Sequence, residues 1–588
     1  MTQAARMDAT GMPPERGMTR CWRARGESGE GPLVRRVLAA RGLRDPDAAA
    51  AFIAASMGGL HEPALLADAD KAAGRLLDAA RAGEPIVIYG DYDVDGVCAT
   101  AILWHTLRAI APGCRVSSYV PHRLDEGYGL NEAAIREIVA GGAKVIVSVD
   151  CGVSAVGPAR VANELGACLM ITDHHTTPGE GQPWPEAHAI VHPRRPGQAY
   201  PFGELCGAGV AFKVAWRLAS LACGGGRVSE HLRGVLLRML PLAAIATVAD
   251  VVPLVGENRI LVKAGLRAVR HSDIPGLRAL IEASGLAGEN VAEEEAGFKL
   301  APRLNACGRL GHARDAVELF TTAEGARAAE LAEMLTRVNR ERQTTEARIV
   351  EEAKARARAE GMTGENRRAI VLASPGWHAG VVGIVCSKLV EAFGRPTILL
   401  CERDGVCHGS GRSIDGFSLY GALARCAAHL TKWGGHDMAA GLTLPTANLP
   451  AFVEAFTAHA NEGIAVDDLI PTAWYDTRAT LLELTPDSVR EVERLAPFGR
   501  ENPRVQVRLD GLRLAGLPQS FGGGKHLDLR VTHERGGGFT RLVWWGMGHA
   551  AGSIQSGMRL EVIVAPKLNT YKGRTTVEGH VVDLRPGA

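Results

Sequence analysis

The chain has 588 residues, of which 46% are hydrophobic and 22% are charged, and its formal net charge at pH 7 is +1. This length predicts three or four domains, each large enough to bury its own core. The near-neutral balance excludes a uniformly basic chain, so a nucleic-acid partner would require local positive patches.

Cysteine usage and hydropathy indicate the compartment. The twelve cysteines form no CxxC pair and no zinc-spaced pair, which fits a reducing compartment better than a disulfide framework. The N-terminus lacks the apolar region of a signal peptide, and no run of about 18 apolar residues is present to span a bilayer. We therefore expect a cytoplasmic protein without a membrane partner.

The N-terminal region carries no signature of a site. Residues 1–31 are rich in Gly, Arg, Glu and Met without apolar periodicity, and we predict a disordered lead. From Leu33 to Arg81 the chain is rich in Ala and Leu at helical spacing, which predicts packing helices.

The stretch 86–96 is an apolar run that ends in three carboxylates at alternate positions, Asp91, Asp93 and Asp95. In an extended backbone alternate side chains share one face, so the three would point the same way if the strand continued through them. Clustered anions repel one another unless a cation lies among them, and a divalent metal with oxygen ligands is the simplest such cation. The alternative is a solvated Asp/Gly turn after a buried strand.

Two later apolar runs end in the same way. Asp150 follows the first of them, and Asp173, His174 and His175 follow the second. Helical patterns separate the three runs, at residues 96–110, 132–141 and 154–165. This alternation predicts a parallel sheet with right-handed crossovers, in which ligands bind outside the carboxyl ends of the strands. All the acids and both histidines fall at those ends.

A fourth acid stands alone in apolar surroundings. Asp250 lies in the segment 242–254, which is otherwise hydrophobic and is predicted to be helical. A buried carboxylate is costly unless it is paired or bound to a metal, so Asp250 requires a partner. The alternative is a helix cap or a hydrogen-bonded core acid.

Four segments together resemble the motifs of the DHH phosphoesterase superfamily: GDYDVDG, VSVDCG, TDHH and VADVVPL. The particular residues of these four segments resemble those of the RecJ family of bacterial single-strand-specific exonucleases. So do three segments later in the chain, GWHAGVVGIVCSKL, SGRS and GGHDMAAG. The resemblance runs from about Leu33 to the C-terminus, with the motifs in order and none missing.

The resemblance implies an α/β fold in several parts. We expect a parallel-sheet DHH domain, joined by a long helix to a smaller α/β DHHA1 domain, and a C-terminal OB-like β-barrel. The predicted divisions are a disordered lead, N-terminal helices with the DHH domain, the connecting helix, the DHHA1 domain and the barrel, at residues 1–31, 32–315, 316–362, 363–470 and 471–588.

Two arginines precede the connecting helix. Arg303 and Arg309 lie amid apolar residues, and half-buried guanidinium groups require anions, of which phosphate is a good one. The alternative is an inter-domain salt bridge. Residues 315–361 are nearly uninterrupted helix formers, which predicts the long helix itself.

A second α/β pattern follows, with strands predicted at residues 368–373, 396–401 and 406–412 and a helix at 378–393. The resemblance implies that this DHHA1-like part grips the substrate. It places these residues on the substrate side: His378, Ser410, Arg412, Gly435 and His436. Arg412 is the best candidate for a terminal phosphate because guanidinium binds oxyanions through two hydrogen bonds. The alternative for His378 and His436 is an ordinary structural role.

The last region changes to short alternating strands with Gly and Pro turns, which predicts a small barrel. From Arg500 to Ala588 there are 13 Lys/Arg against 7 Asp/Glu, so this end carries +6 while the rest of the chain carries −5. Basic residues interleaved with Phe521, Trp544, Trp545 and Tyr571 predict a surface on which single strands stack. The alternative is that the tryptophans fill the barrel core, which must hold for at least one of the adjacent pair.

The resemblance implies two-metal phosphodiester hydrolysis. The expected metal ligands are Asp91, Asp93, Asp95, Asp150, His174 and Asp250. Asp150 is well placed as a bridge, and His175 would contact the scissile phosphate. Mixed Asp/His ligation suits Mn²⁺ better than Mg²⁺, although Mg²⁺ can support activity. We expect Asp173 to orient an imidazole rather than bind metal.

The expected activity is degradation of single-stranded DNA from its 5′ end with release of 5′-mononucleotides, in recombination and DNA repair. The family implies single-strand-binding protein and a RecQ-type helicase as partners, and we expect a monomer. Two alternatives stay open. One is a DHH phosphodiesterase acting on short oligonucleotides or cyclic dinucleotides, and the other is a non-catalytic DHH-fold scaffold that binds single-stranded DNA.

Overall fold

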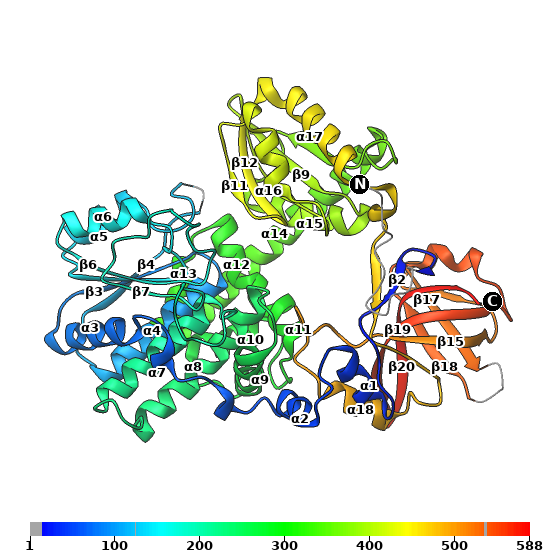
Figure 1. Cartoon of the computed structure of the whole chain (residues 1–588), viewed down its shortest axis with the longest axis horizontal. Helices are drawn as coiled ribbons and strands as arrows, with labels where there is room; N and C mark the ends of the chain where they lie inside the picture. Colours follow the sequence, from blue (N-terminus) through cyan, green and yellow to red (C-terminus); the bar gives the residue numbers. More distant parts are fainter. Residues whose placement is uncertain (1–14, 124, 534–537, 588) are drawn as a thin grey trace. The chain divides into compact units, whose positions relative to one another are not determined.

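A computed structural model describes residues 15–123, 125–533 and 538–587, and it divides into two compact units (Figure 1). We call the first the parallel-sheet unit, which comprises Ala55–Thr345 and the short segment Pro497–Pro503. The second unit holds the remaining residues, which lie before, between and after those two stretches. Each unit is described by itself.

The parallel-sheet unit is built on five strands in the order β4-β3-β5-β6-β7, every pair of which is parallel. The strands are β3 Ile86–Gly90, β4 Val116–Tyr119, β5 Val145–Val149, β6 Cys168–Thr172 and β7 Ala189–Val191. The three strands predicted from apolar runs are confirmed. The two edge strands, β4 and β7, were not predicted because they are too short to show a period.

Helices cover both faces of this sheet (Figure 1). On one face Ile88 and Val147 pack with α3 Ala69–Ala82, α4 Val94–Ile110 and α7 Gly207–Ala222. On the other, Tyr89 and Ile146 pack with α5 Glu132–Ala140 and α6 Val156–Glu164. Burial of the strands on both faces explains why they read as continuous apolar runs rather than as alternating ones.

The unit continues as a helical layer. Its helices are α8 Glu230–Ala249, α9 Gly256–Val269, α10 Pro275–Ala283, α11 Glu293–Glu295, a π-helical turn at Ala296–Leu300, α12 Ala301–Leu310 and α13 Arg314–Thr321. By length and composition α8 is apolar enough to cross a membrane, but 67% of the window that passes this test is buried inside the protein. Such burial is typical of a core helix.

The connecting helix is broken where the sequence predicts continuity. Its two parts are α13 and α14 Gly325–Ala359, with residues 322–324 outside both. The break has a local cause, because the Ala323 N–H bonds back to the Glu318 carbonyl and Gly325 adopts φ = +49°. The prediction of one uninterrupted helix from residue 315 is therefore wrong at this point.

The second unit contains a mixed sheet in the order β11-β12-β10-β9-β8. Its strands are β8 Ile370–Ser374, β9 Thr397–Arg403, β10 Val406–Arg412, β11 Lys432–Gly435 and β12 Ala439–Pro445, and its helices are α15 Ala379–Phe393, α16 Leu419–Arg425 and α17 Leu449–Gly463. Only β8 and β9 run parallel. The predicted strands and the predicted helix are confirmed within two residues.

The C-terminal strands of the second unit close on themselves. They are β15 Val507–Leu514, β16 Gln519–Phe521, β17 His526–His533, β18 Thr540–Trp544, β19 Arg559–Tyr571 and β20 Arg574–Pro586. The pairings run β15-β19-β20-β18-β17, and β17 pairs again with β15. This closed ring of strands confirms the predicted barrel, and β14 Thr477–Ala479 and β16 extend it at its edges.

The predicted disordered lead is wrong from Glu15 onward, while residues 1–14 lie outside the described part of the chain. β1 Glu15–Arg16 and β2 Cys21–Ala24 form a sheet with β13 Thr472–Tyr475. Trp22 is 1% exposed and donates from its indole N–H to Asp583 across 2.8 Å. Composition hid this ordered segment because its partners lie more than 400 residues away. Helices α1 Leu33–Ala40 and α2 Pro46–Ala54 follow it.

The twelve cysteines all lie among the described residues, and all are free thiols.

Candidate metal centre and substrate site

The metal-binding motif begins at a turn from strand to helix. β3 ends at Gly90, and Asp93 is the N-cap of α4, where its carboxylate accepts the N–H groups of Asp95 at 2.8 Å and Gly96 at 3.1 Å. The prediction that the three aspartates share one face of an extended strand is therefore wrong. The turn gathers them instead, and a side chain at Gly96 would lie 2.5 Å from the backbone of Asp91.

Asp150 occupies a strained and crowded position at the end of β5. It is 2% exposed and has φ = +63°, a left-handed conformation that is uncommon outside glycine. A Cβ atom at Gly207 would lie 2.5 Å from its side chain, so the N-terminus of α7 reaches the site only because residue 207 is glycine. The N–H groups of Gly207 and Ala208 donate to the Asp95 carboxylate at 2.6 and 2.7 Å, which stabilises that anion at the helix N-terminus.

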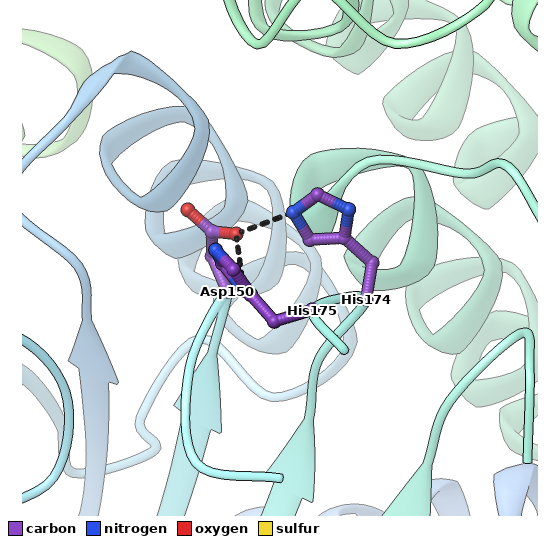
Figure 2. A group of neighbouring side chains, drawn as sticks. All are labelled: Asp150, His174 and His175. Atoms are coloured by element: carbon purple, nitrogen blue, oxygen red, sulfur yellow. Dashed lines mark ion pairs between the residues drawn. The ribbon is translucent and has the colours of Figure 1, made fainter. Parts of the chain in front are cut away.

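Asp150 lies between the two imidazoles that follow β6 (Figure 2). The His174 Nε2 atom is 3.2 Å from Asp150 Oδ1, 3.6 Å from Asp250 Oδ2 and 3.7 Å from Asp95 Oδ2. Asp250 reaches this point from the C-cap position of α8. The His175 Nδ1 atom is 3.9 Å from the same oxygen of Asp150.

The six predicted ligands therefore converge, and their arrangement divides the three N-terminal aspartates, which sequence alone could not do. Ligand atoms within 4.8 Å of one another form the groups Asp91, Asp93, Asp150 and Asp95, His174, Asp250, together with Asp150, His174, His175. Asp150 belongs to two of these groups, and so does His174.

The electrostatics of the centre call for cations. Burial, and after it the neighbouring carboxylates, raise the pKa of Asp91 and Asp150 well above the usual range, of Asp95 to about 6 and of Asp250 to about 9. Burial and the neighbouring His175 lower the pKa of His174 to about 3, so this imidazole is neutral and can offer its lone pair.

Hydrogen bonding points to the same conclusion. One oxygen of Asp91, one of Asp150 and the Nε2 atom of His174 are buried without a hydrogen-bond partner. Buried polar atoms are rarely left so. Carboxylate oxygens with one imidazole nitrogen are the donor set of Mn²⁺ or Mg²⁺, so the residues present fit a divalent metal.

Asp173 is hydrogen-bonded to the imidazole of His175. One of its oxygens accepts from His175 Nδ1 at 2.8 Å and from the His174 N–H at 2.7 Å, and the other accepts the Val153 N–H at 2.8 Å. Burial alone would raise the pKa of Asp173, but these bonds and the imidazoles lower it below the usual range. Burial lowers the pKa of His175, but the hydrogen bond to Asp173 and the charges of Asp173, Asp250 and Asp91 outweigh it and raise the pKa to about 9.

Helix α12 lines this centre. The Asn305 side chain accepts the Val94 N–H at 3.2 Å, and a Cβ atom at Gly308 would lie 2.7 Å from the Tyr92 carbonyl. Arg303 is half-buried and donates to the Thr336 hydroxyl at 3.2 Å and to the Lys299 carbonyl at 2.5 Å. Both of these partners are neutral, so its charge stays available to an anion. The charge of Arg309, on the same helix, acts on Tyr92 beside Asp91.

The second predicted group gathers in the second unit. His378 is the N-cap of α15 and its Nδ1 accepts the Gly380 N–H at 3.1 Å. Ser410 and Arg412 lie on β10 against the first turns of this helix, where a Cβ atom at Gly383 would lie 3.3 Å from the Ser410 hydroxyl and 3.5 Å from the Arg412 guanidinium.

The GGH segment reaches the same edge of that sheet. Arg412 pairs with Ala439, whose carbonyl accepts the His436 N–H at 2.8 Å, and Gly435 pairs with Ala440. Gly435 has φ = +139°, a backbone conformation that would be strained in a residue with a side chain. The five predicted substrate residues are therefore neighbours in the second unit.

Comparison with known families agrees with this architecture. The model of the DHH family N-terminal domain matches residues 85–240, that of the DHHA1 domain matches 366–462, and that of the RecJ OB domain matches 475–583. The single-stranded-DNA-specific exonuclease RecJ of Dickeya dadantii is 34% identical over 563 residues, which cover 94% of this chain and 96% of the relative. This chain belongs to the RecJ family.

Other RecJ proteins differ in length. RecJ of Bacillus subtilis is 37% identical over 545 residues, and the match covers 92% of this chain but 66% of that relative. Among solved structures, RecJ of Thermus thermophilus in complex with Mn²⁺ has a TM-score of 0.79 at 30% identity, covering 94% of this chain and 76% of that one. The same protein was solved with Mg²⁺, with a TM-score of 0.72. The family, the fold and the metal dependence expected from the motifs are confirmed.

The RecJ barrel carries an exposed aromatic group. Trp544, the last residue of β18, is 3% exposed and fills the core, while Trp545, in the turn that follows, is 50% exposed. The Trp545 ring lies 5.6 Å from Phe521 and 4.8 Å from His526, and Tyr571 is 70% exposed. Sequence reasoning predicted this division without saying which tryptophan faces outward.

Sequence reasoning missed one residue of the RecJ centre. The Tyr128 hydroxyl lies 2.9 and 3.0 Å from the two ring nitrogens of His175 and 3.3 Å from the Asp150 carbonyl. Its signal in the sequence is the pair of glycines that flank it, at 127 and 129.

Proposed function

We propose that this chain is a divalent-metal-dependent exonuclease that degrades single-stranded DNA from the 5′ end and releases 5′-mononucleotides. The observation that carries the proposal is the convergence of five carboxylates and a neutral imidazole around buried, unpartnered atoms. The setting supports it, because the chain covers 96% of a relative named as a single-stranded-DNA-specific exonuclease.

The two groups of ligands suggest two metal positions. Asp91, Asp93 and Asp150 would hold one ion, and Asp95, His174 and Asp250 would hold the other. The Oδ1 atom of Asp150 lies 3.2 Å from His174 Nε2, which supports Asp150 as the bridge between the positions. Two divalent ions would lower the pKa of a bound water and stabilise charge on the attacked phosphorus and on the leaving oxygen.

The remaining residues of the chain orient and bind. His175 is about one-third exposed and fixed by Asp173, so it can donate to a nonbridging oxygen of the scissile phosphate. Arg303 and Arg309 on α12 add positive charge beside the carboxylates, which would otherwise repel the substrate.

The second unit would select the end of the strand. Arg412 with Ser410, His378 and the segment Gly435–His436 forms the phosphate-binding surface that we assign to the 5′ end. The exposed aromatic group of the barrel would hold the strand by stacking.

We retain the domain divisions from residue 32 onward as part of the proposal. The matched segments 85–240, 366–462 and 475–583 lie inside the proposed domains 32–315, 363–470 and 471–588. Family membership supports a cytoplasmic monomer that acts in recombination and DNA repair beside single-strand-binding protein and a RecQ-type helicase.

The test is hydrolysis of one oligonucleotide in three forms: labelled at the 5′ end, labelled at the 3′ end, and annealed as a blunt duplex. We expect immediate release of labelled mononucleotide from the 5′-labelled single strand alone, with Mn²⁺ or Mg²⁺, and none with a chelator or in Asp150→Asn. Early release of the 3′ label would reverse the polarity. Binding of single strands without release of either label would favour the non-catalytic scaffold.

A further inference from the structure

Tyr128 stands on a segment built to project it. Its neighbours Gly127 and Gly129 have φ = +84° and +83°, a left-handed conformation that residues with side chains rarely adopt. Two such residues around one tyrosine make the backbone bend sharply on both sides of it. The Tyr128 ring is 52% exposed as a result, although its hydroxyl reaches the buried centre.

The segment is fixed on either side of this bend. The Tyr89 hydroxyl donates to the Gly129 carbonyl at 3.0 Å. Before the bend, the Glu126 carboxylate accepts the His122 N–H at 2.6 Å, the Tyr119 hydroxyl at 2.7 Å and the Asn131 amide at 3.2 Å. Hydrogen bonds on both sides of the bend therefore set the position of Tyr128.

The hydroxyl holds the imidazole from a second side. Asp173 Oδ1 lies 2.8 Å from His175 Nδ1 and takes the proton of that nitrogen. The Tyr128 hydroxyl lies 2.9 Å from Nδ1 and 3.0 Å from Nε2, so it stands over the face of the ring, and it donates to the Asp150 carbonyl at 3.3 Å. The Nε2 atom therefore keeps its own N–H for the phosphate. The ring of His175 is held at its Nδ1 edge by Asp173 and over its face by Tyr128, with its Nδ1 atom 3.9 Å from the Asp150 carboxylate.

We propose that Tyr128 is a positioning residue that fixes the rotamer of His175 before the substrate arrives. The inference rests on the proposed function and assigns this role to a residue outside the six ligands. An imidazole held only by Asp173 can swing about that single bond, whereas one that also has the Tyr128 hydroxyl against its face meets the phosphate in one orientation. Such preorganisation acts on the rate of the chemical step more than on the affinity for the strand.

The experiment compares Tyr128→Phe, which removes only the hydroxyl, with wild type on the 5′-labelled single strand with Mn²⁺. We expect kcat to fall about 10- to 100-fold, as is usual when a group that orients a site residue is lost. KM should stay within about threefold, because the ring and the phosphate-binding arginines are unchanged. The Mn²⁺ concentration for half-maximal activity should also be unchanged.

Tyr119→Phe is the matched control. It removes a hydroxyl from the same anchored segment, but Glu126 keeps its bonds to His122 and Asn131. We expect its kcat to stay within about twofold of wild type. An equal loss in both variants would show that the segment as a whole matters and would overturn the role of Tyr128.

A double variant tests the coupling directly. If Tyr128 acts through His175, Tyr128→Phe with His175→Ala should be no slower than His175→Ala alone. Fully additive losses, or a Tyr128→Phe enzyme as active as wild type, would overturn the inference while leaving the proposed function intact. An inactive wild-type enzyme would overturn the proposed function and the inference with it.

Discussion

At the scale of the residue, the carboxylates of the centre oppose folding when no metal is bound. Burial and mutual repulsion raise the pKa of Asp250 to about 9 and of Asp95 to about 6, and that of Asp150 well above the usual range. The folded chain must keep protons on these groups or hold charges that repel one another. Function and stability therefore conflict here, as they do at many active sites.

This conflict predicts how stability depends on pH. The folded carboxyls have pKa values above the unfolded ones, so the folded state binds more protons between about pH 4 and 9 and loses stability as the pH rises through that range. The raised pKa of His175, about 9, adds to the loss above pH 6.5. In a chelator we expect Tm to fall from pH 6.5 to 8.5. With saturating Mn²⁺ the fall should vanish, because ligand binding requires the deprotonated groups. An equal fall with and without metal would contradict this.

Asp150→Asn should separate activity from stability. Asparagine tolerates the left-handed φ of +63°, so the variant removes one negative charge without straining the backbone. We expect activity to fall at least about 1,000-fold and the metal-free protein to gain about 1 kcal/mol in free energy of unfolding. Asp404→Asn is the matched control, since Asp404 also has a positive φ but is fully solvated. A metal-free Asp150→Asn protein less stable than wild type would contradict the account.

At the scale of the element, the centre depends on helices that approach the strand ends closely. The N-terminus of α7 reaches Asp150 through Gly207, and α12 reaches the Tyr92 carbonyl through Gly308. A single added methyl group at either position would collide with the ligand loops.

Gly207→Ala should therefore damage the site out of proportion to its size. The added Cβ would lie 2.5 Å from Asp150, so α7 or the aspartate must shift. We expect a loss of about 1 to 3 kcal/mol in stability, as for other overpacked cores, and a weaker apparent affinity for Mn²⁺. Gly234→Ala in α8 is the control, because nothing lies within 4 Å of its added Cβ. That change should stabilise the protein by about 0.5 to 1 kcal/mol. Melting curves and Mn²⁺ titrations of both variants decide the matter, and equal effects would refute the packing argument.

The elements also explain what the sequence could predict. Buried parallel strands read as continuous apolar runs, so β3, β5 and β6 and the acids after them were found. The grouping of the aspartates was not found, because it depends on Asp93 turning from strand to helix cap. β2 was missed because its partners, β13 and Asp583, are distant in the chain. Tyr128 was missed because its contact with His175 exists only once two loops meet.

At the scale of the whole molecule, a short segment links the barrel's part of the chain to the metal centre's unit. Residues 497–503 belong to the parallel-sheet unit, although the residues on either side belong to the other. The Arg500 carbonyl accepts the Leu254 N–H at 2.8 Å, and the Asn502 amide donates to the Pro497 carbonyl at 2.8 Å. Leu254 lies four residues after the predicted metal ligand Asp250. The segment 497–503, which precedes the barrel strands in the chain, is therefore hydrogen-bonded close to that ligand in sequence.

If the barrel binds the strand and the metal centre cleaves it, substitution of two adjacent tryptophans should affect different properties, stability for one and binding for the other. Trp544 is 3% exposed, so Trp544→Ala should cost about 3 to 5 kcal/mol in stability. Trp545 is 50% exposed beside Phe521, so Trp545→Ala should leave Tm nearly unchanged. Its effect should fall on binding: loss of one base-stacking contact, about 1 to 3 kcal/mol, raises KM about 5- to 150-fold for a long oligonucleotide. KM for a strand too short to reach the barrel, and kcat for both, should stay near wild type. If Trp545→Ala lowered kcat on the short strand, the barrel would serve the chemistry itself rather than the grip on the substrate.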